Sequence, residues 1–344
     1  MEVKTKKKLV VIASILLAVI VAYLLIALLP RGHNYEGENK MMKEGELPIL
    51  IAHGGGNKEF PDNTLEAFYN AYSVDNRVMM ETDVSITKDG VVILSHDTTL
   101  DRKTNVTGNI IDWNYSDLIS ERVDFGYTNQ TKNGILVEGS ERVHFNVDGV
   151  NKYPTDVEYP EGITPRDDEV FLATTLEELI TSFPENRINV EIKQSGETGL
   201  TCLMAVIDLL EEHDAFDRVV CASFHGEIYD QMKRLKSEGK VPEGFMFSPG
   251  TDGVIRYYIL FLLGLDRFFA DEMCVFQLPT EEYGFSLSTE GLVNNAHAHN
   301  LAVHYWTIND KDEMRRLIDI GADGIMTDYP HRLAEVYAER AVVN

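Results

Sequence analysis

Six polar residues stand where short apolar segments of the sequence end, and their types suggest chemistry at a phosphate ester. They are His53, Glu81, Asp83, His96, Glu191 and Lys193. Glu81 and Asp83 lie two apart in a strand-like segment, and side chains two apart on a strand point to the same face. Carboxylate oxygens are the ligands that hard divalent cations such as Mg²⁺ and Ca²⁺ prefer. Glu81, Asp83 and Glu191 are therefore the candidate ligands of a divalent ion that would neutralise a phosphoryl group.

The two histidines are candidates for proton transfer. Histidine titrates near neutral pH, so His53 and His96 could serve as general base and general acid in one displacement at phosphorus, in either order. Lys193 shares a strand face with Glu191, and it either stabilises negative charge on phosphoryl oxygens or forms an ion pair with a carboxylate. Each signal is weak alone, because a histidine at a strand end is more often structural than catalytic.

These residues need a scaffold that brings strand ends together. Apolar, strand-like segments cover residues 47–52, 79–86, 91–95, 187–192, 219–223, 245–247, 273–277, 302–307 and 324–327. Helical patterns alternate with them, at residues 65–72, 176–180, 199–213 and 228–236 among others. About eight strands with helices between them predict a closed parallel (β/α)8 barrel of the TIM type. In such barrels the chemistry lies at the carboxyl ends of the strands, where the candidate residues fall.

The alternation fails over residues 105–166, approximately. This stretch is polar and rich in Gly, Asn and Pro, with no sustained period. It predicts a small insertion in the barrel, of unknown role. The expected organisation is thus an anchor at residues 1–31, a polar linker at 32–46, and a barrel at 47–344.

The anchor is expected because residues 9–29 are apolar and uncharged. About 20 such residues suffice for a helix to cross a bilayer. Four lysines precede the segment and only Arg31 follows it closely. The positive-inside bias then predicts a single-pass protein of the cell membrane with its catalytic body outside the cytoplasm. A cleaved signal peptide is the alternative, but the apolar run is longer than usual and lacks a small-x-small cleavage site.

Composition excludes several classes of partner and site. The formal net charge of −25 argues against nucleic acid or an anionic lipid surface as a general partner. The three cysteines, Cys202, Cys221 and Cys274, are widely spaced and form no CxxC. A disulfide-dense scaffold and a cysteine zinc site of ordinary spacing are therefore excluded.

Several ordered sequence blocks resemble the glycerophosphodiester phosphodiesterase family. They are IAHGG (51–55), PDNTLEA (61–67), ETDV (81–84), DGVV (89–92), HD (96–97), VEIK (190–193), WTIN (306–309) and GADGIMTDYP (321–330). The resemblance implies a TIM-type barrel, a divalent ion on Glu81, Asp83 and Glu191, and acid/base roles for His53 and His96. It implies cleavage of glycerophosphodiesters to glycerol phosphate and an alcohol. Trp306, within one block, either walls the substrate pocket or belongs to the core.

One position departs from the family pattern. The family usually has His-Arg-Gly where this chain has His53-Gly54-Gly55, so a guanidinium that could clamp phosphate is absent. Either another cation substitutes, with Lys58 or Lys193 nearest in sequence, or the substrate or activity differs. Three hypotheses follow: a glycerophosphodiester hydrolase, a lysophospholipase D-type or other phosphodiester-cleaving enzyme, and an inactive membrane-bound barrel that acts as a binding or scaffold protein.

Overall fold

The computed structural model describes residues 2–27, 30–129, 131–132, 135–136 and 142–343, and its body is a (β/α)8 barrel. Eight strands among these residues form the wall: β1 (Ile49–His53), β2 (Met79–Ile86), β10 (Ile188–Ile192), β11 (Val219–Ala222), β12 (Met246–Phe247), β13 (Val275–Leu278), β16 (Ala302–Tyr305) and β17 (Gly324–Thr327). Each neighbouring pair is parallel, in the order β12-β11-β10-β2-β1-β17-β16-β13. The backbone N–H of Cys274 donates to the carbonyl of Phe247 at 3.3 Å, so the sheet is nearly closed between its two ends.

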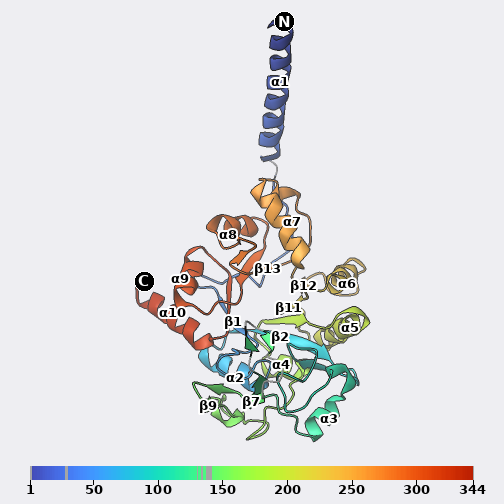
Figure 1. Ribbon diagram of the computed structural model, residues 1–344, viewed down its shortest axis with the longest axis vertical. Coiled ribbons are helices and arrows are strands. Elements are labelled where there is room, and N and C mark those ends of the chain that lie inside the picture. Colours follow the sequence, from blue (N-terminus) through green and yellow to red (C-terminus); the bar gives the residue numbers. More distant parts are fainter. Residues whose placement is uncertain (1, 28–29, 130, 133–134, 137–141, 344) are drawn as a thin grey trace.

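A helix follows each barrel strand and covers the outside of the wall (Figure 1). These helices are α2 (Leu65–Val74), α4 (Leu176–Ser182), α5 (Gly196–Glu212), α6 (Gly226–Ser237), α7 (Thr251–Leu262), α8 (Glu290–His297), α9 (Lys311–Asp319) and α10 (Pro330–Val343). Thr64 caps α2, and Thr175 with Glu178 forms a capping box on α4. The predicted barrel is confirmed, and α2 and α4 each start at a threonine that caps the helix.

The strand expected at residues 91–95 is confirmed, but it is not part of the parallel barrel wall. Residues 92–94 form β3 (Val92–Leu94), which pairs antiparallel with β2 through Ile86 and Val92, outside the parallel wall. Asp89 and Gly90 make a turn too short for a parallel return, which needs a crossover of a dozen or more residues. Gly90 has φ +86°, a conformation that favours glycine. The hairpin brings the end of β3 back beside Asp83.

Between β3 and α4 the chain leaves the barrel and forms small elements on the end of the molecule opposite to α1 (Figure 1). They are η1 (Ile110–Asp112), α3 (Tyr115–Ser120), β4 (Tyr127–Asn129), β5 (Thr131–Lys132), β6 (Ile135–Leu136), β7 (Arg142–His144), β8 (Asn146–Val147), β9 (Val150–Asn151) and η2 (Pro154–Asp156). The strands pair only among themselves, as β4-β7, β5-β6 and β8-β9. A second excursion holds η3 (Asp266–Phe268), and the hairpin β14 (Glu281–Glu282) and β15 (Phe285–Ser286) follows β13.

Residues 32–46, expected as a linker, pack against the amino ends of the barrel strands. Met41 is fully buried, and its carbonyl is 2.7 Å from Nε2 of His304 on β16. The side-chain amide of Asn39 donates to the carbonyl of Cys274 at 2.7 Å. Tyr35 and Met41 belong to a buried apolar cluster with Ile51 of β1. The segment therefore closes the end of the barrel that lies away from the catalytic end.

The N-terminal residues form one helix, α1 (Glu2–Ala27), which stands out from the body (Figure 1). Among the described residues, no helix has the length and apolarity required of a membrane span. Leu28 and Leu29, the last residues of the expected span, lie outside the described residues, and the expected membrane anchor is not supported. The location of the body outside the cytoplasm stays a prediction.

Candidate active site

The carboxyl ends of the barrel strands surround a cavity of about 260 Å³. Six of the seven predicted site residues line it: His53, Glu81, His96, Glu191, Lys193 and Trp306. Asp83, the seventh, lines an adjoining cavity of about 420 Å³ that also contains His53 and His96. The structure therefore brings all seven together at one end of the barrel.

The three predicted metal ligands form one cluster. Glu81 and Asp83 project from β2, and Glu191 of β10 is paired in register with Asp83. One carboxylate oxygen from each lies within 4.8 Å of the others. Glu81 and Asp83 are each only 3% exposed. Three carboxylates at this spacing, two of them buried, are a donor set that suits a divalent cation with oxygen ligands.

The electrostatics of the cluster also favour a cation. Burial, followed by the charge of Asp83, raises the pKa of Glu81 to about 8. Burial likewise raises the pKa of Glu191, partly opposed by Lys193. Lys193 Nζ lies 3.0 Å from Asp83 Oδ1 and 2.9 Å from Glu191 Oε1. One lysine balances part of the charge of three carboxylates, and a divalent ion would balance the rest.

His53 ends β1 and is paired in register with Glu81. Its Nδ1 lies 2.6 Å from Asp328 Oδ1, and its Nε2 lies 4.0 Å from Glu81 Oε2. Burial lowers the pKa of His53, but the hydrogen bond to Asp328 and the charges of Glu81 and Asp83 outweigh burial and raise it to about 9. Without a bound cation the imidazole is therefore protonated at neutral pH, with Nε2 facing the carboxylates.

His96 approaches the same carboxylates from β3. The backbone N–H of Ser95 donates to the carbonyl of Asp83 at 2.8 Å, which fixes the end of β3 beside β2. The side chain of His96 is 51% exposed, and its Nδ1 lies 2.9 Å from Asp97 Oδ1. The hydrogen bond to Asp97 raises the pKa of His96, with burial acting in the opposite direction. The β2-β3 hairpin is thus the element that adds a second histidine to the site.

Three residues that orient the site were missed in the sequence. Asn63 (φ +60°) donates from Nδ2 to Asp83 Oδ2 at 3.1 Å, and its Oδ1 accepts the backbone N–H of Asp83 at 3.1 Å. Asp328 holds His53, and Asn309 Nδ2 donates to Asp328 Oδ2 at 2.7 Å. All three lie in sequence blocks that resemble the family. Position in those blocks was the signal that could have found them.

Gly54 is built into the turn after β1. Its N–H donates to Glu81 Oε2 at 2.9 Å, its φ is +55°, and a Cβ atom there would lie 2.9 Å from Cβ of Asp62. The position that carries arginine in the family therefore faces Asp62. Lys58 and Lys193 were the candidates to replace that arginine, but neither is beside Asp62. Lys193 is paired with two carboxylates, and Lys58 is an exposed residue of the cavity wall.

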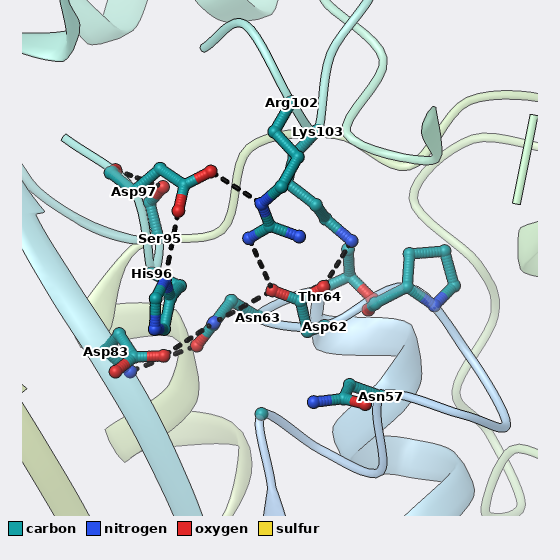
Figure 2. Close-up of polar contacts among 12 residues, drawn as sticks. Asn57, Asp62, Asn63, Thr64, Asp83, Ser95, His96, Asp97, Arg102 and Lys103 are labelled. Carbon is teal, nitrogen blue, oxygen red and sulfur yellow. Dashed lines mark hydrogen bonds and ion pairs between the residues drawn. The ribbon is translucent and has the colours of Figure 1, made fainter. Parts of the chain in front are cut away.

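The cations beside Asp62 are Arg102 and Lys103, from the loop after β3 (Figure 2). They line the same cavity as Gly54, His53 and His96.

An apolar groove opens from the site on the side of α7. Its volume is about 580 Å³, and it shares Phe224, Pro249, Gln277 and Trp306 with the catalytic cavity. The rest of its lining is largely apolar, from α7 and the β14-β15 hairpin: Thr251, Val254, Ile255, Tyr258, Ile259, Leu262, Leu278, Pro279, Glu282, Tyr283, Phe285 and Leu287. Trp306 packs edge-on against Phe224 with ring centroids 6.3 Å apart. Trp306 therefore lies in the wall between a polar cavity and an apolar groove.

A model of the "Glycerophosphoryl diester phosphodiesterase family" matches residues 53–332. Lysophospholipase D GDPD1 of Rattus norvegicus is 27% identical over 316 residues, which cover 85% of this chain and 87% of that protein. Two solved structures share the fold at 20% identity. One is the glycerophosphoryl diester phosphodiesterase domain of a Mycobacterium tuberculosis protein, with a TM-score of 0.62 over 85% of this chain and 99% of that one. The other is an Oleispira antarctica phosphodiesterase in complex with its product sn-glycerol-3-phosphate, with a TM-score of 0.57 over 85% and 97%.

Proposed function

Because the chain belongs to the glycerophosphoryl diester phosphodiesterase family, we propose that it hydrolyses glycerophosphodiesters to glycerol phosphate and an alcohol. The observation that carries the proposal is the meeting of three clustered carboxylates with two histidines at one end of the barrel. Glu81, Asp83 and Glu191 would hold a divalent ion, Mg²⁺ or Ca²⁺, which would neutralise charge on the phosphoryl oxygens. The presence of both histidines and all three carboxylates supports an enzyme over an inactive scaffold.

The histidines divide the proton transfers between them. His53, held at Nδ1 by Asp328, donates a proton from Nε2 to the leaving alcohol oxygen as the P–O bond breaks. His96, held at Nδ1 by Asp97, accepts at Nε2 the proton of the glycerol hydroxyl that attacks phosphorus, and water then opens the cyclic phosphate that forms to give glycerol phosphate. Lys193 lines the cavity, and its ammonium group faces phosphoryl charge as well as the carboxylates.

The direct test is turnover with and without metal. The purified full-length chain should release glycerol phosphate from glycerophosphocholine and glycerophosphoethanolamine when Mg²⁺ or Ca²⁺ is present. A chelator should remove the activity, and an excess of the ion should restore it, because the carboxylate cluster would lose its cation and regain it. Product is measured by an enzymatic assay for glycerol 3-phosphate. No release with either ion would contradict the proposed substrate class.

The apolar groove favours a second candidate function, lysophospholipase D-type cleavage. A lysophospholipid has a phosphodiester head and one acyl chain, and the groove offers apolar side chains that begin where the catalytic cavity ends. Its volume is within the range of ligand pockets. Each buried methylene of the chain would stabilise the complex by about 0.8 kcal/mol. A relative that matches most of this chain is named a lysophospholipase D.

A charged side chain in the groove should weaken binding of a lysophospholipid and leave binding of a glycerophosphodiester unchanged. Ile259 on α7 lines the groove and is 51% exposed. The Ile259→Glu variant should raise the KM for monomeric lysophosphatidylcholine tenfold or more, since about two methylenes of lost burial correspond to that factor. The KM for glycerophosphocholine should stay within about twofold.

The matched control is Val150→Glu, which places the same charge on an exposed valine of the β8-β9 hairpin, outside the groove. Equal effects of Ile259→Glu on both substrates, or no effect on either, would show that the groove does not hold the acyl chain.

A further inference from the structure

An unbroken series of charged contacts runs from His96 into the protein (Figure 2). His96 Nδ1 lies 2.9 Å from Asp97 Oδ1, and Arg102 Nε donates to Asp97 Oδ2 at 2.6 Å. Arg102 Nη2 then lies 3.6 Å from Asp62 Oδ2, and Lys103 Nζ donates to Asp62 Oδ1. Five charged or titratable side chains from the turn after β1 and the loop after β3 are thereby joined.

The series becomes more buried with distance from the histidine. The side chain of His96 is 51% exposed, those of Asp97 and Arg102 are 25%, that of Asp62 is 13%, and that of Lys103 is 7%. Exposed ion pairs contribute little, because solvent screens them and side-chain freedom is lost. The ion pair between Asp62 and Lys103, at the buried end, is screened less by solvent. It can therefore anchor the contacts that hold the exposed imidazole of His96. Phe145 of the insertion covers that end, with its ring centroid 5.9 Å from Lys103 Nζ.

The net charge of the cluster indicates whether it could bind a phosphodiester anion. Two cations, Arg102 and Lys103, face two carboxylates, Asp62 and Asp97, so the cluster holds little surplus positive charge for a phosphodiester anion. A phosphate clamp in place of the missing arginine is therefore the weaker interpretation. The contacts favour a role in orienting His96. Arg102 binds the carboxylate of Asp97, and that carboxylate contacts Nδ1 of His96 and not Nε2.

The same cluster is also tied to the proposed metal site. Asn63 Nδ2 lies 3.4 Å from Asp62 Oδ2 and 3.1 Å from Asp83 Oδ2. Asp62 thus connects through Arg102 to His96 and through Asn63 to Asp83. The cluster therefore holds His96 at a set distance from the carboxylates. An attacking oxygen must fit between the imidazole and the proposed metal site, so this distance matters for the reaction.

We propose that Arg102 is a positioning residue for His96, acting through Asp97 and anchored by Asp62 and Lys103. The inference rests on the proposed role of His96 in proton transfer. It assigns a function to Arg102, for which the sequence predicted none, and it explains how an exposed imidazole keeps one orientation.

The test compares Arg102→Ala and Arg102→Lys with the wild type, in glycerophosphocholine hydrolysis by the full chain with its metal. Arg102→Ala should lower kcat about 10- to 100-fold with KM changed by less than about threefold, because a small misplacement of a catalytic group costs rate more than binding. Arg102→Lys should keep an intermediate kcat, and added ethylguanidinium should partly restore Arg102→Ala. Thermal unfolding confirms that each variant is folded.

Arg122→Ala is the matched control, since Arg122 pairs with Asp167 on the surface and its side chain is 54% exposed. It should leave kcat unchanged. The decisive comparison is the double variant Arg102→Ala/His96→Ala. It should be no slower than His96→Ala alone, because a residue that acts through His96 has nothing to position once the imidazole is gone.

Other outcomes would contradict either the positioning role of Arg102 or the catalytic role of His96. A KM rise above tenfold with normal kcat would make Arg102 a substrate-binding residue and overturn the proposal. Additive losses in the double variant would overturn it as well. Normal turnover by Arg102→Ala with an inactive His96→Ala would remove the positioning role alone. Normal turnover by His96→Ala would remove the proposed role of the histidine, and the positioning role with it.

Discussion

Replacing His53 or His96 by alanine should lower kcat for glycerophosphodiester hydrolysis about 10²- to 10⁴-fold, the usual contribution of a general acid or base. Both imidazoles line the cavity beside the carboxylate cluster, and each has a carboxylate on its Nδ1. Neither is a proposed metal ligand, so folding and metal binding should survive. Steady-state kinetics and thermal unfolding with and without Mg²⁺ measure the two effects separately.

His213→Ala provides the control, because His213 ends α5 and contacts Glu177 on the outside of the barrel. It should retain wild-type turnover. If His53→Ala or His96→Ala turns over at a near-normal rate, that histidine has no part in proton transfer. If either variant loses the stabilisation that Mg²⁺ gives, its lost turnover is explained by the metal site instead.

The Glu81→Gln variant should lose at least 100-fold in activity and yet be more stable than the wild type without metal. Outer residues around a metal typically contribute 10- to 100-fold, so a ligand should contribute no less. Without a cation, ionised Glu81 is buried beside Asp83, and burial and that charge raise its pKa from 4.5 to about 8. Glutamine keeps an oxygen for the N–H of Gly54 and carries no charge.

The sign of the pH dependence follows from that raised pKa. The protonated form of Glu81 stabilises the folded metal-free protein fully below pH 4.5, and this stabilisation is lost as the pH rises toward 8. In chelator at pH 8, Glu81→Gln should therefore exceed the wild type in unfolding free energy by about 1 kcal/mol or more, the value of one pKa unit. Near pH 4.5 the difference should shrink.

Urea unfolding at the two pH values measures the stability difference, and Mg²⁺ titration completes the test. The ion should stabilise the wild type more than Glu81→Gln, because the variant lacks one charged ligand. Glu243→Gln, at an exposed position in the loop before β12, is the control and should change neither property. A lower stability of Glu81→Gln in chelator at pH 8 would mean that Glu81 is paired in the metal-free protein.

Local sequence determined most of the barrel and the types of the catalytic groups. The strands β2 and β17 have the bounds expected from the sequence, residues 79–86 and 324–327. In β17 the signal is a short apolar run, as expected of a barrel strand buried on both faces, and in β2 it is an alternation that puts Glu81 and Asp83 on one face. Thr64 and Thr175 mark helix starts through contacts within four residues. Placement of the candidate residues at strand ends followed from parallel βα repeats, since every parallel strand then ends on the same side.

Only the tertiary structure decided which residues support those groups and what adjoins them. Asp328 is 275 residues from His53, and Lys103 is 41 from Asp62, and no periodicity in a sequence reports such contacts. The groove arises because α7 and the β14-β15 hairpin, which touch through Tyr258 and Phe285, line one hollow with Trp306, and the sequence of neither segment indicates the other.

The pairing of β3, by contrast, follows from local sequence. Its apolar run is like that of a barrel strand, but the short Asp89-Gly90 turn before it dictates antiparallel pairing with β2. Local patterns fix an element and its buried face, whereas partners distant in the chain are chosen by how the whole barrel packs.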